Sequence, residues 1–284
     1  MEYKIGFVIL HYNAYKETIQ CAKSIMDKLD TDCYEIIIVD NDSPNKSLPI
    51  IQDELKDYKQ IHFIQLNENI GFAKGNNEGI NYARKTLNCD FVCCLNNDTE
   101  IIQNDFFKVI LEEYNQSHFG LLGPKIVLND GYNPTNENYH VNLDRFEKDL
   151  KELKLAYFLT KIYIGELIKK LRKSHPKNQK TDIDKRLENV MLHGCCLVFS
   201  PTFFEKLEGF YHDTFMFREE EFLFIRCQQN NLKTVYNPQL LIRHYEDSAT
   251  NSIYKTSRTK SLFHLKNSII STQKLITYMK ENKV

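Results

Sequence analysis

The first part of the chain alternates between short apolar runs and stretches whose apolar residues recur at helical spacing. The apolar runs cover 5–10, 34–39, 61–66 and 91–95, and the helical patterns cover 15–29, 48–58, 76–87 and 104–114. A strand that is apolar throughout is buried on both faces, and strands that alternate with helices form a parallel sheet. The pattern therefore predicts an α/β fold with a Rossmann-like, mostly parallel central sheet flanked by helices. Asn13 is the expected N-cap of the first helix.

Polar residues follow three of the four apolar runs directly. They are 11–13 (HYN), 40–42 (DND) and 96–98 (NND). In open α/β sheets, ligands bind outside the carboxyl ends of the strands. We therefore expect these three segments to meet at one edge of the sheet and to form a ligand site there.

The motifs of several nucleotide-binding classes are missing. The first strand–helix turn, HYNAYK, has no glycine, whereas a dinucleotide site needs G-x-G-x-x-G there. The chain also lacks a P-loop and the Gly- and Arg-rich N-terminal loop of sugar pyrophosphorylases. A site of carboxylates and amides remains, in which Asp98, supported by Asn96 or Asn97, would present oxygens to Mg²⁺ or Mn²⁺. Such a cation would hold a diphosphate.

Composition narrows the class of protein further. The formal net charge is -1, which argues against a nucleic-acid binder. Eight cysteines are present without C-x-x-C spacing, so we expect buried thiols rather than a zinc site or disulfides. No apolar run reaches the roughly 18 residues that a membrane span needs. We expect a cytoplasmic protein, peripheral to the inner face of the cell membrane.

The second half of the chain is less regular. Residues 129–142 resemble a loop, and 145–185 form a basic stretch with helical spacing. This stretch either packs on the domain as a helical insertion or lies on an anionic membrane through 145–186. Strands are expected at 190–200 and 240–242, and a C-terminal helix after residue 255. The expected division is 1–128 (first α/β half), 129–189 (loop and insertion), 190–250 (second half of the same domain) and 251–284 (helical tail).

Five blocks of the sequence together resemble the family 2 glycosyltransferases of GT-A fold, near the bacterial rhamnosyltransferase-like branch. The blocks are VILHYNAYKETIQCAKSI, IIIVDNDSPN, NENIGFAKGNNEGINYA, FVCCLNNDTEI and GCCLVFSPTFFEKLEGF with FMFREEEFLFIRC. They cover most of 1–250 in order. The resemblance implies an inverting enzyme that moves a sugar from a UDP- or dTDP-linked donor to a hydroxyl of a growing cell-surface glycan. The acceptor would be a polysaccharide, O-antigen or capsule precursor, in a lipid-linked form suggested by the basic stretch.

The resemblance also implies roles for individual residues. The nucleotide base and ribose would be held by Tyr12, Asn13, Asp40 and Asp42. The donor would be bordered by Asn69, Gly71, Lys74, Gly75 and Asn76, with Asn97 assisting. Asp98 matches the metal-binding carboxylate of a D-x-D-like motif whose first position is Asn96 here, and His244 would reach the metal or the diphosphate.

Glycines 71, 75 and 79 recur every four residues. We expect Gly71 to adopt a positive φ or to allow close approach of the backbone to a ligand, and Gly79 to allow close helix packing.

Three consecutive acids, Glu219, Glu220 and Glu221, match the region of the family's Glu-Asp motif. Its second position is the catalytic base, which is Glu220 here, with Glu219 as the alternative. A helix N-terminus would keep this base ionised at neutral pH. Glu221 is expected to be a solvated acid of the helix's first turn. His193 carries less weight, as does Arg226, which is expected to pair with neighbouring acids.

Two other functions stay open from the sequence. One is a non-catalytic nucleotide-sugar-binding subunit of the same fold, suggested by the missing first Asp and the unusual Glu triplet. The other is a metal-dependent nucleotidyltransferase.

Overall fold

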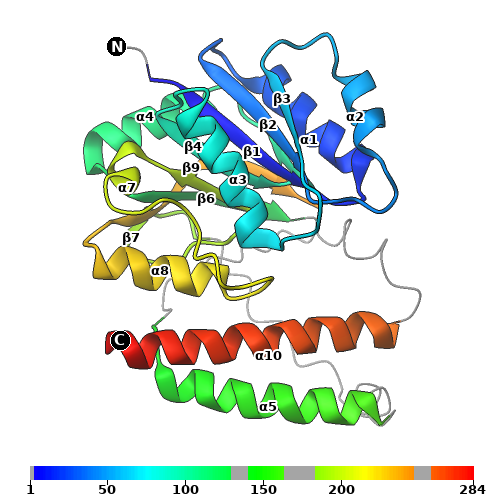
Figure 1. The fold of residues 1–284 in the computed structure, drawn as a ribbon. Helices are drawn as coiled ribbons and strands as arrows, with labels where there is room; N and C mark the ends of the chain where they lie inside the picture. The colour runs from blue at the N-terminus through cyan, green and yellow to red at the C-terminus, as the bar shows by residue number, and fades with distance from the viewer. Residues whose placement is uncertain (1–2, 129–139, 163–182, 246–256) are drawn as a thin grey trace.

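A computed structural model describes residues 3–128, 140–162, 183–245 and 257–284. The described strands form one nine-stranded sheet of order β3-β2-β1-β4-β8-β6-β9-β5, with β7 paired to β9 (Figure 1). The strands are β1 (Ile5–His11), β2 (Tyr34–Asp40), β3 (Ile61–Gln65), β4 (Phe91–Asn96), β5 (Thr99–Ile101), β6 (Leu121–Leu128), β7 (Leu187–Glu188), β8 (Cys196–Phe199) and β9 (Thr234–His244). The helices are α1 (Tyr15–Lys28), α2 (Leu48–Glu54), α3 (Phe72–Lys85), α4 (Phe106–Ser117), α5 (Leu143–Lys161), α7 (Pro201–Phe204), α8 (Glu219–Gln229) and α10 (Ser257–Asn282).

The parallel half of the sheet confirms the prediction from the apolar runs. β1 pairs in parallel with β2 and β4, and β2 pairs in parallel with β3. One core lies between the sheet and helices α1, α2 and α4. A second core lies on the opposite face, under α3, α7 and α8 (Figure 1). Because both faces are covered, the central strands β1, β2 and β4 are mostly apolar and buried, whereas β3 at the edge is only partly buried.

The second half of the sheet departs from the expected strands. β8 runs antiparallel between β4 and β6, and β5 runs antiparallel to β9. The strand expected over 190–200 is confined to β8, and the one expected over 240–242 is the end of β9. β6 was not predicted from the sequence, because Pro124 interrupts its apolar run and proline within a run argues against a strand. In the structure, Pro124 lies at the register shift between β6 and β9.

One N-cap and one helix start differ from the expected ones. α1 begins at Tyr15 as expected, but its N-cap is Ala14, and Asn13 has a left-handed backbone (φ 63°) and does not cap the helix through its side chain. α3 begins at Phe72, so Lys74, Gly75 and Asn76 lie in its first turns rather than in a loop.

Helices α5 and α10 lie side by side below α8 (Figure 1). Phe146 of α5 packs with Leu275 and Met279 of α10 and with Phe222 of α8. The described part of the basic stretch therefore packs on the domain, as one of the two alternatives expected, and the C-terminal helix is confirmed. The remaining part of that stretch, 163–182, lies outside the described residues. No described helix is both long enough and apolar enough to cross a bilayer.

The eight cysteines are free thiols, and all except Cys33 are buried. Burial raises the pKa of Cys21, Cys89 and Cys227 to about 12. The expectation of buried, unpaired thiols is thus confirmed.

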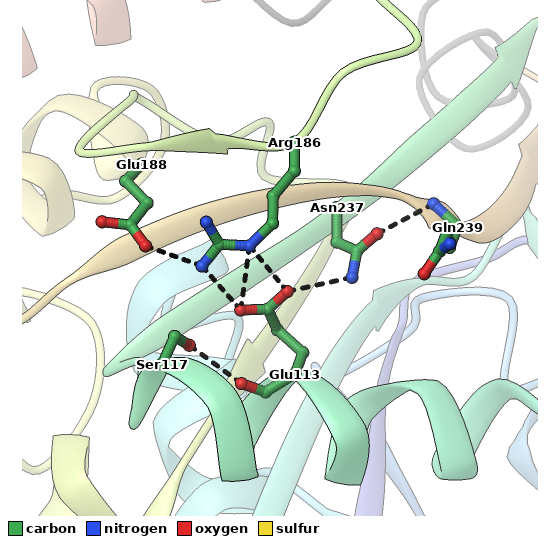
Figure 2. Close-up of polar contacts among 6 residues, drawn as sticks. All are labelled: Glu113, Ser117, Arg186, Glu188, Asn237 and Gln239. Carbon is green, nitrogen blue, oxygen red and sulfur yellow. Dashed lines mark hydrogen bonds and ion pairs between the residues drawn. The ribbon is translucent and has the colours of Figure 1, made fainter.

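A buried ion pair fixes the chain where it returns from the insertion (Figure 2). Arg186 donates from Nε and Nη2 to both oxygens of Glu113 of α4, at 2.8–3.2 Å. Arg186 also binds Glu188 at 2.7 Å, and Asn237 of β9 donates to Glu113 at 3.0 Å. The Glu113 side chain is only 1% exposed, so these donors compensate its burial. The pKa of Arg186 is raised, chiefly by its hydrogen bonds to Glu113.

Replacing Arg186 with alanine should destabilise the fold substantially. The change leaves a buried carboxylate without its cation, which typically costs about 3–5 kcal/mol. Chemical denaturation would measure the loss. Asp184→Ala is the matched control, since it removes a 78% exposed acid from an ion pair in the same segment and should cost less than about 1 kcal/mol. Equal losses for the two variants would contradict this role.

Candidate functional site

Asp98 and His244 form the centre of the site. Asp98 lies in the turn between β4 and β5, and His244, at the end of β9, pairs with Thr99 of β5. His244 Nε2 lies 3.2 Å from Asp98 Oδ1, and both side chains are about 10% exposed. The other ring nitrogen of His244, Nδ1, is buried and has no hydrogen-bond partner in the described structure. The structure therefore places next to each other two residues that the sequence had suggested separately as metal contacts.

This donor set fits a divalent cation that is completed by ligand oxygens. Within the described residues, no group of three or more His, Cys, Asp or Glu side chains is placed to hold a metal. Mg²⁺ is usually bound through one or two carboxylates together with substrate phosphates, so Asp98 would supply the carboxylate and His244 a second protein ligand. The side-chain Nδ2 of Asn97 donates to Thr18 Oγ1 at 3.2 Å and to the Ala14 carbonyl at 3.4 Å, which fixes the orientation of this amide beside Asp98.

The acid pair begins α8. Glu220 Oε1 accepts a hydrogen bond from the Gly194 amide at 2.5 Å, and Glu219 accepts one from Thr214 Oγ1 at 3.4 Å. Burial raises the pKa of both carboxyl groups to about 7. Desolvation therefore outweighs the effect of the helix N-terminus on these two groups, and both carboxyl groups are less acidic than the helix argument led us to expect. Glu221 is not solvated either; it is buried.

Residues 193–195 join the acid pair to the Asp98–His244 pair. The backbone N–H of Asn96 donates to the Cys195 carbonyl at 2.9 Å. The backbone N–H of Gly194 donates to the Glu220 carboxylate. The His193 ring centre lies 6.0 Å from that of His244. The two parts of the site, which are far apart in sequence, are thus neighbours.

His193 belongs to the site although the sequence gave it little weight. Its Nδ1 accepts from the Cys195 amide at 3.2 Å, so the proton of the neutral ring lies on Nε2. Burial lowers the pKa of His193 to about 4, with a further lowering by His244. The neutral ring is therefore a hydrogen-bond donor at the edge of the site. In the sequence His193 lies inside the strand expected over 190–200, and nothing there indicated its place in the site.

The ends of β1 and β2 form a second polar cluster. Asp40 Oδ1 accepts from the amide and hydroxyl of Ser43, at 3.1 and 2.5 Å, and the Asn13 amide donates to Ser43 Oγ at 3.0 Å. The side-chain oxygen Oδ1 of Asn13 is buried without a partner in the described structure, whereas Asp42 is exposed. Tyr12 is half-buried beside them. This arrangement leaves polar atoms for a ligand.

Asn41, which the sequence analysis did not select, organises the loop before α3. Its amide donates to Asn69 Oδ1 at 3.1 Å and to the Gly71 carbonyl at 3.2 Å. Gly71 has φ 88°, which confirms the expected positive φ. A Cβ there would lie 2.3 Å from the Phe215 carbonyl oxygen, so the close approach is to the protein's own backbone.

The α3 residues have mixed environments. Lys74 is exposed. A Cβ on Gly75 would lie 2.6 Å from Leu10, and one on Gly79 would lie 2.3 Å from Val8, so both glycines allow α3 to pack on β1. Asn76 donates to the Phe72 carbonyl within the helix. Arg226 donates to the Gly209 carbonyl at 2.8 Å and lies over Tyr211, rather than pairing with the neighbouring acids.

The known proteins to which this chain is similar agree on its family. The family model described as "Glycosyl transferase family 2" matches residues 7–208. The low-salt glycan biosynthesis hexosyltransferase Agl10 of Haloferax volcanii is 24% identical over 273 residues, which cover 88% of this chain and 78% of that protein. The teichoic acid poly(glycerol phosphate) polymerase of Staphylococcus epidermidis is 27% identical over 168 residues. That match covers 59% of this chain and only 21% of the polymerase.

Solved structures share the fold. The crystal structure of residues 1–349 of S. aureus TarS superposes with a TM-score of 0.54 at 14% identity, covering 94% of this chain and 72% of that one. At this identity the likeness establishes the α/β fold with its mostly parallel mixed sheet.

The Asp98–His244 pair should bind Mn²⁺. Asp98→Asn and His244→Ala should each weaken Mn²⁺ binding by about tenfold or more, since each removes one of two protein ligands. Calorimetry or Mn²⁺ electron paramagnetic resonance would measure the affinity. His62→Ala is a control, because His62 pairs with Glu35 elsewhere in the fold. Unchanged affinity in both site variants would contradict the assignment.

Proposed function

The chain belongs to glycosyl transferase family 2, and from this membership we propose an inverting enzyme of the rhamnosyltransferase-like branch. It transfers a hexosyl or deoxyhexosyl group from a UDP- or dTDP-linked donor to a hydroxyl of a growing cell-surface glycan. The observation that carries the proposal is that residues 193–195 bring the acid pair beside the Asp98–His244 pair. A carboxylate that accepts a proton and a site for a diphosphate are the two parts that a single displacement needs.

Glu220 is the proposed base. Its carboxylate takes the proton of the acceptor hydroxyl as that oxygen attacks the anomeric carbon, and the bond from this carbon to the diphosphate oxygen breaks on the opposite face. A pKa near 7 suits this task, because an effective base has a pKa near the working pH. The Gly194 amide holds the Glu220 carboxylate in place. Glu219, with the same pKa and a weaker hydrogen bond, is the alternative base.

Asp98 and His244 would hold the divalent cation, Mg²⁺ or Mn²⁺, which stabilises the charge of the departing diphosphate when it is bound. Tyr12, Asn13, Asp40 and Asp42 are the proposed contacts to the base and ribose. The orphaned Asn13 oxygen supports this, since a buried acceptor without a donor is costly and a ligand N–H or O–H would satisfy it.

The names of the relatives guide the choice of acceptor. One concerns glycan biosynthesis and the other teichoic acid, so a polymer of the cell surface is the proposed acceptor class. A lipid-linked form would place the enzyme at the inner face of the membrane.

The outward side of α5 supports a membrane contact. This outer face of α5 carries three exposed apolar side chains and three exposed lysines: Lys151, Lys154, Leu155, Phe158, Lys161 and Ile162. Leu155 and Phe158 are 58% and 57% exposed. The nearby acids Glu147 and Glu152 pair with other lysines, Lys280 and Lys148. Apolar groups flanked by exposed lysines suit an anionic lipid surface.

The pH dependence of transfer tests the role of Glu220. Because the base must be deprotonated, kcat/KM should fall as the pH falls through about 7. Glu220→Gln should lower kcat by about a hundredfold or more and remove this limb. Glu112→Gln is the control, as an exposed acid of α4.

Full transfer by Glu220→Gln would refute the assignment. Nucleotide-sugar binding without transfer or hydrolysis by the wild type would favour a non-catalytic subunit, and pyrophosphate release from a sugar phosphate and a nucleoside triphosphate would favour a nucleotidyltransferase.

Vesicle partition tests the outer face of α5. Replacing Lys151, Lys154 and Lys161 with glutamine should weaken binding to phosphatidylglycerol vesicles by about tenfold or more. The same replacement should leave binding to phosphatidylcholine vesicles unchanged. Leu155→Gln with Phe158→Gln should weaken binding to anionic vesicles too. The matched apolar control is Ile50→Gln with Tyr58→Gln, which are 46% and 42% exposed elsewhere. Unchanged partition of the α5 variants would contradict the contact.

A further inference from the structure

Two consecutive non-glycine residues with left-handed backbone precede the acid pair. Phe217 has φ 75° and Arg218 has φ 71°. Such a conformation costs on the order of 1–3 kcal/mol per residue and persists only where the surroundings hold it. The direction in which α8 leaves the loop 213–218, and hence the position of Glu220, depends on this pair of residues.

The Arg218 side chain joins three helices at this point. Nη1 lies 2.6 Å from Glu221 Oε1 of α8, Nε donates to Thr272 Oγ1 of α10 at 3.1 Å, and Nη2 lies 3.4 Å from Asp149 Oδ2 of α5. The guanidinium also lies over the Phe146 ring of α5, at 5.2 Å. The Arg218 side chain is 20% exposed and that of Glu221 is 9% exposed. A lysine would satisfy only part of this set, since only the guanidinium is a planar fork of five donors.

α10 also holds the backbone of the loop. Ser271 Oγ donates to the Met216 carbonyl at 2.7 Å, and the Lys274 ammonium donates to the Asp213 carbonyl. On its other side, the loop accepts at the Phe215 carbonyl from the Phe72 amide of α3, at 2.8 Å. The loop 213–218 is therefore fixed between α10 and the start of α3, where the donor is proposed to bind.

We infer that Arg218 is a positioning residue for the acid pair, and that the α5–α10 helix pair acts through it to place Glu220 at the acceptor. The inference rests on the proposed function. Arg218 also acts on Glu220 electrostatically, since its charge lowers the pKa of that carboxyl group against the raising effects of burial and of Glu221. The strained backbone, the three-helix contact and the neutralised Glu221 all concern the same turn.

Comparison of Arg218→Ala with Arg258→Ala tests the inference. Arg258 of α10 donates to the Thr160 and Lys161 carbonyls of α5 at 3.1 and 2.8 Å, so it joins the same two helices at a distance from the loop. Arg218→Ala should lower kcat by about tenfold or more, as small misplacements of reacting groups do, with the donor KM changed less than about twofold. Arg258→Ala should keep the wild-type kcat, even if its Tm falls as much as that of Arg218→Ala. Arg218→Lys should recover part of the loss.

Hydrogen exchange separates this inference from the proposed function. Amides of 213–220 should exchange faster in Arg218→Ala and not in Arg258→Ala, whatever reaction the wild type performs. Absence of transfer by the wild type would refute the proposed function and leave the exchange comparison as a test of the restraint. Unchanged kcat in Arg218→Ala, or losses in both variants that follow Tm alone, would overturn the positioning role.

Discussion

The antiparallel pairing of β4 with β8 is the interaction on which the site depends. Val92 to Leu95 pair with Phe199 to Cys196, and Cys93 and Cys196 are 103 residues apart in sequence. Both strands are buried on both faces, so a shift by one residue would exchange the side chains of two different cores. This register places the turn that holds Asp98 beside residues 193–195. Through Gly194, the same register fixes where Glu220 of α8 can lie.

Burial gives the residues of this site their chemistry. It raises the pKa of Glu219 and Glu220 to about 7 and lowers that of His193 to about 4. Both shifts favour the uncharged form, which costs less to bury than the charged one. The Gly194 amide binds Glu220, and Arg218 binds Glu221 and joins α8 to the α5–α10 helix pair. Helices α5 and α10 are therefore linked through Arg218 to the helix that carries the acid pair.

The sequence predicted the parallel half of the fold because its strands are uninterrupted apolar runs, and Asp98 stood out because it follows one of them. β9 was underestimated because Pro238 interrupts its apolar pattern, and β6 was missed for the same reason at Pro124. The positive φ of Gly71 was predictable from a glycine in a loop. The roles of His193 and Arg218 were not, because their partners are distant in sequence: Asp149 lies 69 residues from Arg218. The pKa of Glu220 likewise depends on burial by distant segments, which a local helix argument does not include.

The most direct test of the account is the position of a bound cation. Crystals grown with Mn²⁺ and a nucleoside diphosphate would locate the metal by anomalous scattering. We expect a peak at about 2.0–2.3 Å from Asp98 and His244, completed by diphosphate oxygens, with the Glu220 carboxylate free of the metal and open to the acceptor side. A metal coordinated by Glu219 or Glu220, or one bound away from Asp98, would contradict it, because the acid pair would then hold the cation rather than accept a proton.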